Sequence, residues 1–138
     1  MSTTTVPRAG YRATTTQVMR YLAMAGGTLA VVQFALAGFG AFRSLDGDQK
    51  GFGAHQAVGY IVALLSLLAL VAALIARPNQ RTIILAIVLF VVAGPIQPML
   101  PDLAKDHGAW IGALHGLLGI AILGLFGQLS RKVAVAQG

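Results

Sequence analysis

Four long stretches without a charged residue divide this chain, and they limit its fold more than any other feature. The four runs are residues 21–42, 51–76, 82–101 and 108–130. A helix needs about 20 apolar residues to cross a hydrocarbon core of roughly 30 Å, and each run is long enough. Only 10% of the 138 residues are charged, which is too few for the surface of a soluble domain of this size. We therefore expect a chain that lies in a lipid bilayer.

The runs predict an all-α fold, a four-helix transmembrane bundle of up-down-up-down topology that forms one domain. We expect spans at about residues 21–42, 53–76, 82–100 and 109–130, after a short basic N-terminal tail of residues 1–20. The third span ends with Pro95, Pro98 and Pro101. Each proline removes a backbone donor and clashes with the preceding turn. We expect this helix to kink near Pro95 and to unwind by Pro98.

The basic residues predict the orientation of the bundle. Seven lie in the tails and the second loop: Arg8, Arg12, Arg20, Arg77, Arg81, Arg131 and Lys132. Three lie in the first and third loops: Arg43, Lys50 and Lys105. Cytoplasmic segments carry the excess of Lys and Arg, so both termini are expected in the cytoplasm. The basic residues flank the spans and do not line one face, which argues against nucleic-acid binding.

Two short motifs recur in the same order. F-x-x-A-G occurs at residues 34–38 and 90–94, and H-x-x-x-G occurs at residues 55–59 and 115–119. Both pairs have nearly the same separation along the chain. The repeat predicts two tandem helical hairpins of the same orientation.

The repeat makes His55 and His115 corresponding residues of the second and fourth spans. They lie roughly 6 and 10 Å from the outer starts of their charge-free runs. These two helices should be diagonal in the bundle, roughly 11–14 Å apart, which suits two imidazoles on opposite faces of one haem iron. Gly59 and Gly119, one turn further in, remove side chains and would let a flat macrocycle approach the backbone. The predicted site is one haem b with bis-histidine ligation.

Charged and aromatic residues near the outer rim complete the predicted site. Arg43, Lys50 and Lys105 could pair with haem propionates. Tyr60 and Trp110 could neighbour the ring, although Trp110 is better explained as an interfacial aromatic.

Other residues give weaker signals. His107 beside Asp106 is expected in a loop, as a reserve ligand or proton carrier. Gln33 and Gln97 could line a quinone pocket, but bonding between helices is the safer interpretation. Zinc would require three or four ligands, and the interior offers two histidines and no carboxylate. The chain has no cysteine, which excludes thiolate metal sites.

The placement of His55 and His115 resembles the four-helix haem-b modules of bacterial membrane cytochromes and, more closely, one half of haem A synthase. That family carries histidines near the outer ends of its second and fourth helices. The resemblance covers the four spans and implies a multi-pass protein of the prokaryotic plasma membrane. Haem A synthase has an acidic residue shortly before its second-helix histidine, whereas residues 51–54 here contain none, so hydroxylase chemistry is not implied. The chain also resembles small four-helix membrane proteins of actinobacteria.

These observations support a mono-haem electron-transfer protein, because two axial histidines leave no position on the iron for oxygen. A quinone or a redox protein would be its partner, and no catalytic residue is assigned. The alternative is a non-catalytic accessory or scaffold subunit, within a homo-oligomer or a larger membrane complex, in which the histidines are structural. A channel or carrier is the weakest hypothesis, because polar lining residues are lacking.

Overall fold

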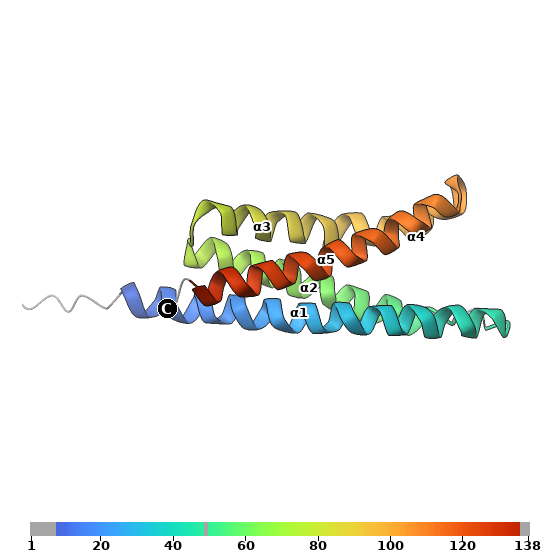
Figure 1. Ribbon diagram of the computed structural model, residues 1–138, viewed down its shortest axis with the longest axis horizontal. Helices are drawn as coiled ribbons and strands as arrows, with labels where there is room; N and C mark the ends of the chain where they lie inside the picture. The colour runs from blue at the N-terminus through green and yellow to red at the C-terminus, as the bar shows by residue number, and fades with distance from the viewer. Residues whose placement is uncertain (1–7, 49, 136–138) are drawn as a thin grey trace, which may run out of the picture.

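The structure is a computed structural model that describes residues 8–48 and 50–135, and all regular structure in these ranges is helical. The elements are α1 (Arg8–Leu45), α2 (Gly53–Ala76), α3 (Gln80–Val91), the π-helical segment η1 (Val92–Ile96), α4 (Gln97–His107) and α5 (Ala109–Val135). The segments α3, η1 and α4 follow one another without a break and form one bent rod (Figure 1). The chain therefore has four helical rods, each long and apolar enough to span a membrane.

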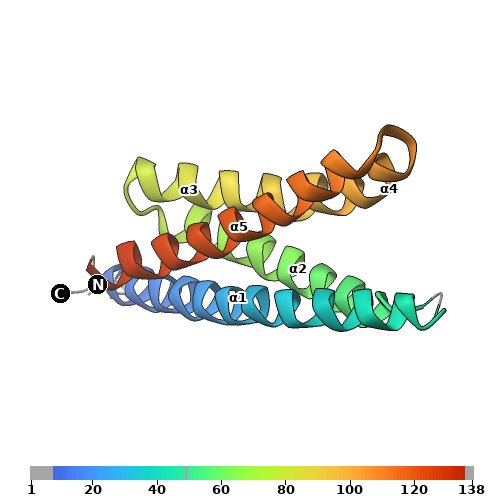
Figure 2. The ribbon, with the colours of Figure 1, turned by 45° about the vertical axis from the view of Figure 1, so that its right-hand side comes forward.

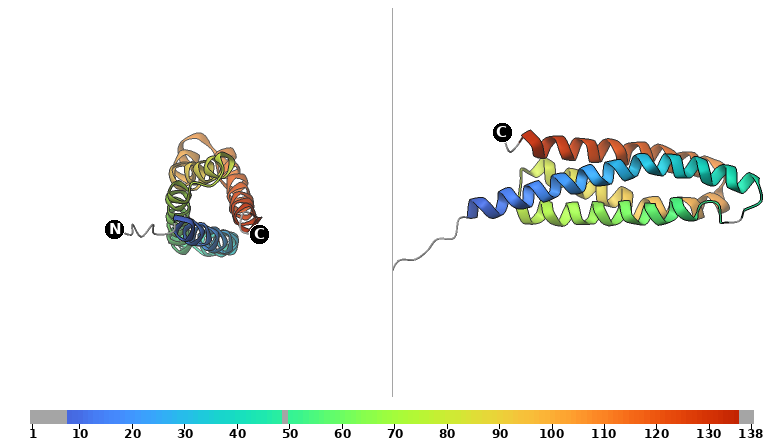
Figure 3. Two further views of the ribbon diagram at one scale, coloured as in Figure 1. Left: turned by 90° about the vertical axis from the view of Figure 1, so that its left-hand side faces the viewer. Right: turned by 90° about the horizontal axis from the view of Figure 1, so that it is seen from below.

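The four rods pack as an up-down-up-down bundle. Helix α1 packs against α2 and α5, and the rod of α3 and α4 also packs against α2 and α5. Helices α2 and α5 therefore face each other across the diagonal, as the end-on view shows (Figure 3). The predicted fold class is confirmed. The described ends of α1 and α5 lie at one end of the bundle, and the α1–α2 and α4–α5 connections lie at the other (Figure 2).

Helix α1 starts much earlier than the predicted first span. Residues 8–20, which were expected in a tail, continue the same helix. Thr14, Thr15 and Thr16 each donate their hydroxyl to the carbonyl four residues earlier. Their hydroxyl groups are thus satisfied within the helix, so the helix can extend past the change in hydropathy at residue 21 toward the N-terminus.

The third rod bends but does not unwind, so the expectation that it ends by Pro98 is wrong. The π-helical segment η1 contains Pro95, and the backbone N–H of Gln97 donates to the carbonyl of Val92. Pro98 follows the π-helical segment directly, as the second residue of α4. Helix α4 therefore continues to His107, which is its exposed last residue and does not lie in a loop.

Side chains fill the half of the bundle near the termini. The largest fully buried ones are Met19, Leu89, Phe126 and Leu129. Small residues let the backbones approach, and buried Gly26 of α1 lies directly against the ring of Phe126. The half near the α1–α2 and α4–α5 connections differs. No residue is buried in stretches 31–39, 53–61, 94–99 and 112–121, one from each rod. The fully buried core thus lies in the half of the bundle near the termini.

Candidate functional site

His55 lies in the first turn of α2 and is held by α1. Its Nδ1 is 3.1 Å from the backbone carbonyl oxygen of Gln33. A carbonyl can only accept, so Nδ1 carries the ring proton and donates it. Nε2 of the neutral ring is left with a free lone pair. The side chain is half-buried, and the ring of Phe52 meets it edge-on at 6.2 Å between centroids.

His115 of α5 has the same arrangement in the second hairpin. Its Nδ1 is 3.2 Å from the carbonyl oxygen of Gln97, so this ring also keeps its Nε2 free. The side chain of Gln97 adds a second bond, because its Nε2 donates to the backbone carbonyl of His115 at 3.1 Å. In each hairpin, the backbone carbonyl of a glutamine therefore accepts a hydrogen bond from Nδ1 of a half-buried histidine.

The two histidine rings meet across the diagonal of the bundle. Their centroids are 6.0 Å apart, and the ring planes cross at 63°. A metal–nitrogen bond is about 2.0–2.1 Å, and a ring centroid lies roughly 1 Å behind the nitrogen, so two imidazoles on opposite sides of one ion have centroids roughly 6 Å apart. The observed spacing suits that arrangement. Among the described residues, no third histidine, cysteine or carboxylate joins this pair.

The space beside the two predicted glycines is used by glutamine side chains. A Cβ on Gly59 would lie 2.8 Å from Nε2 of Gln33, and one on Gly119 would lie 3.7 Å from Nε2 of Gln97 and 3.6 Å from Cζ of Phe34. The amide oxygens Oε1 of both glutamines are buried and have no hydrogen-bond partner within the part of the chain that the structure describes. Buried acceptors without a partner are costly, which points to a hydrogen-bond donor that belongs at this site.

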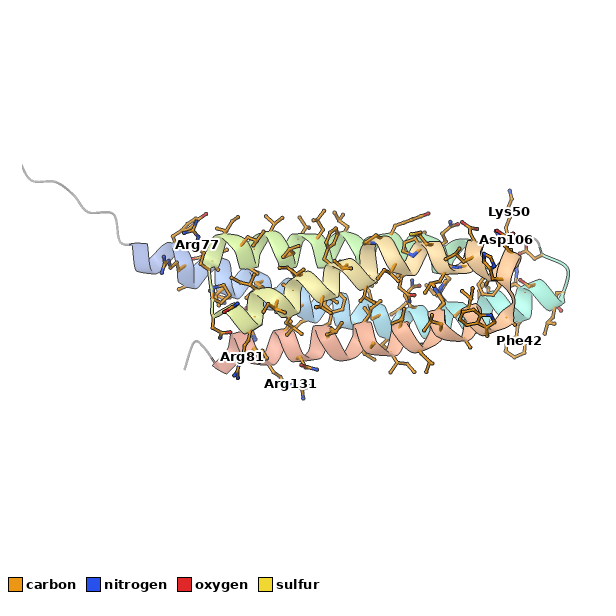
Figure 4. All side chains as sticks on the ribbon, turned by 90° about the horizontal axis from the view of Figure 1, so that it is seen from above. Phe42, Lys50, Arg77, Arg81, Asp106 and Arg131 are labelled. Carbon is orange, nitrogen blue, oxygen red and sulfur yellow. The ribbon has the colours of Figure 1, made fainter. Side chains whose placement is uncertain are left out.

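The charged residues expected near the propionates lie at the same end as the histidines. Figure 4 shows Lys50 and Asp106 at this end, opposite Arg77, Arg81 and Arg131. Arg43 donates from Nε to Asp48 at 2.9 Å, and Lys105 donates to Asp102 at 2.7 Å. The backbone N–H of Lys50 and then the Arg43 guanidinium lower the pKa of the Asp48 carboxyl. Arg43 and Lys105 are thus paired with aspartates, and their role toward a haem stays a prediction.

The aromatic neighbours differ from those expected. Trp110 is 66% exposed, and its Nε1 donates to the carbonyl of His107, which agrees with an interfacial role. Tyr60 is exposed and accepts from Gln56. Phe52 is the aromatic residue that contacts a histidine ring. Its position three residues before His55 could have signalled this contact.

The glutamines show that the repeat is not uniform. His55 follows Gln33 by 22 residues, whereas His115 follows Gln97 by 18. The two glutamines are therefore equivalent in the site, although the F-x-x-A-G motifs would align other residues. The connections explain this, because residues 46–52 join α1 to α2 while Gly108 alone joins α4 to α5. Gln33 and Gln97 appeared in the sequence as amide side chains, and nothing there indicated a role for their backbone carbonyls.

Comparisons with known proteins give one family. The profile of a family of unknown function (DUF6220) matches residues 33–100. The match includes Gln33, His55 and Gln97 and ends before His115. No curated protein and no solved structure matches the chain. The chain is thus similar, from the second half of α1 to the first turn of α4, to a family described only as of unknown function.

Proposed function

We propose that this chain is a mono-haem b-type membrane protein in which His55 and His115 ligate one iron from opposite sides. The observation that carries the proposal is the pair of rings 6.0 Å apart, each with its Nδ1 bonded to a backbone carbonyl. Metal-ligating histidines usually donate their other N–H in this way, which orients the ring and makes the ligating nitrogen more basic.

The packing around the histidines supports a large flat cofactor. Residues around Phe126 are fully buried, whereas none in the stretches around His55 and His115 is. The two hairpins also diverge toward this end of the bundle (Figures 1 and 2). A bare ion would need more ligands than the two histidines, whereas a macrocycle brings four of its own.

Haem b supplies reversible one-electron chemistry when bound. The protein's part is to hold both axial nitrogens and to keep the iron inside an apolar bundle. Because both axial positions belong to histidines, we propose electron transfer with a quinone or a redox protein as the partner. The excess of basic residues at the end with the termini supports cytoplasmic termini in a prokaryotic plasma membrane.

A second function is favoured by the same hydrogen bonds. The Nδ1 bonds tie α1 to α2 and α4 to α5, which is what structural histidines in a scaffold or accessory subunit would do. Such bonds contribute about 0.5–1.5 kcal/mol each. In that case the protein binds no haem, and replacing either histidine lowers stability without any spectral effect.

The absorption spectrum of protein purified from haem-sufficient cells decides between them. We expect a Soret band and, on reduction, sharp α and β bands. His55→Ala and His115→Ala should each abolish the low-spin spectrum, while His107→Ala, at an exposed helix end, should keep it. Colourless wild-type protein that takes up no added haem would support the scaffold. An unchanged spectrum in His55→Ala or His115→Ala would refute the ligand assignment.

A further inference from the structure

The carbonyl that holds His115 lacks its usual helical donor. In an α-helix, the carbonyl of Gln97 would accept from the backbone N–H of residue 101. Residue 101 is proline, which has no N–H. The Gln97 carbonyl lies inside α4, and Nδ1 of His115 donates to it at 3.2 Å. The bond from His115 therefore takes the place of the missing bond from residue 101.

The carbonyl that holds His55 is shared. Gln33 lies in the middle of α1, and residue 37, four positions later, is an alanine with a backbone N–H. The Gln33 carbonyl therefore accepts two hydrogen bonds, one from the helix and one from His55 at 3.1 Å. An acceptor that serves two donors gives less to each of them. The two histidine bonds have nearly equal lengths. The difference between the two hairpins therefore lies in the other donor that the Gln33 carbonyl accepts.

The second half also has the additional bond from the Gln97 side chain to the His115 backbone. No matching bond from Nε2 of Gln33 occurs among residues 8–48 and 50–135. This nitrogen lies against Gly59 instead. The π-helical segment η1 directly precedes Gln97, and a π-turn changes the face that the following residues present. The third rod thus carries three features at this contact that α1 lacks.

We propose that Pro101 is a positioning residue for His115, acting through the backbone carbonyl of Gln97, and that it makes His115 the more electron-donating of the two imidazoles. Pro101 frees the Gln97 carbonyl, and this carbonyl then draws the Nδ1 proton of His115 more strongly than Gln33 draws that of His55. The ligating nitrogen of His115 becomes more basic as a result. The consequence for a bound haem rests on the function proposed above, whereas the asymmetry between the two rings does not.

Pro101→Ala tests the asymmetry directly. Alanine restores an N–H at position 101, so the Gln97 carbonyl would accept two hydrogen bonds, as the Gln33 carbonyl already does. The probe is the ring-nitrogen NMR shifts of ¹⁵N-histidine in the metal-free protein in detergent, detected through the carbon-bound ring protons. Wild-type protein should show different Nδ1 shifts for His55 and His115. Pro101→Ala should move the His115 shift to that of His55 and leave the His55 shift unchanged.

A control variant separates the backbone carbonyl from the side chain. Gln97→Met removes the side-chain donor but keeps the backbone carbonyl, and should preserve the His115 Nδ1 shift. The inference is overturned if the two wild-type shifts coincide, if Pro101→Ala leaves His115 unchanged, or if Gln97→Met has the same effect as Pro101→Ala.

Haem-loaded protein gives a second readout. Weaker donation from His115 should raise the reduction potential of Pro101→Ala relative to wild type and to Gln97→Met, because a less basic histidine ligand would stabilise the oxidised iron less. An unchanged potential would overturn the electronic consequence. If the protein binds no haem, the proposed function fails by its spectrum, and the NMR shifts of the metal-free protein still decide the asymmetry.

Discussion

The contact between Gly26 and Phe126 offers the sharpest test of the packing that holds the two hairpins together. Gly26 lies in α1, and the Phe126 ring of α5 is fully buried against it. A Cβ on Gly26 would overlap ring atoms of Phe126. The neighbouring Gly27 differs, since its Cβ would lie 3.5 Å from Cβ of Phe126, an ordinary contact.

These two glycines make a matched pair of variants. Replacing glycine by alanine within a helix stabilises it by up to about 1 kcal/mol, and both variants share this gain. Overpacking a filled core costs about 1–3 kcal/mol, and this cost falls on Gly26→Ala alone. We therefore expect Gly26→Ala to be less stable than Gly27→Ala by about 1–3 kcal/mol, a difference from which helix propensity cancels.

Reversible unfolding in mixed micelles, followed by circular dichroism, measures this difference. Gly26→Ala should cost less stability in the Phe126→Leu background than in the wild-type background, because the smaller side chain makes room for the methyl group. Equal stability of Gly26→Ala and Gly27→Ala would refute the reasoning. So would a double variant whose two losses simply add, since the loss would then not come from the ring.

Two further predictions concern the loops. Asn79 caps α3 by accepting from the backbone N–H and the hydroxyl of Thr82, so Asn79→Ala should cost about 0.5–2 kcal/mol in the same unfolding assay, and Asn79→Asp should restore most of it. An unchanged stability of Asn79→Ala would contradict the cap. The pKa of Asp48 is lowered from its ordinary value of 3.8 by the backbone N–H of Lys50 and by Arg43. The charged carboxylate is therefore favoured in the folded loop, and its contribution is present above pH 3.8 and lost as the pH falls through the lower folded pKa. A ¹³C titration of the carboxyl should give a midpoint below 3.8 that rises in Arg43→Ala; a midpoint at or above 3.8 in wild-type protein would contradict the pairing.

The sequence allowed the class of the fold and the level of the site to be predicted. Charge-free runs are a property of composition, and length alone decides whether such a helix can cross a bilayer. His55 and His115 could be placed at one level because helical rise is constant. The ends of the rods were harder to predict. Helix α1 includes residues 8–20, because local side-chain hydrogen bonds satisfy its threonines. The third rod continues beyond Pro98 because a π-helical segment accommodates Pro95. Hydropathy describes neither effect.

The partners of the histidines could not be read from the sequence. A backbone carbonyl looks the same at every residue, so nothing marked those of Gln33 and Gln97. Pro101 was visible as a helix breaker, whereas its effect on the Gln97 carbonyl depends on His115 lying across α4. The motif repeat also suggested a uniform duplication, which the unequal connections between the helices do not follow.

The sequence by itself determined four membrane-spanning helices, because apolar side chains and backbone groups without water leave a helix as the stable state of each run. It also determined that two histidines lie within those helices near one end. Only the tertiary structure decided that their rings are 6.0 Å apart and that both Nδ1 atoms are bonded to backbone carbonyls. That arrangement depends on the diagonal packing of α2 and α5 and on contacts between residues that are distant in the chain. Such contacts are set by the side chains of all four rods together, and no single segment encodes them.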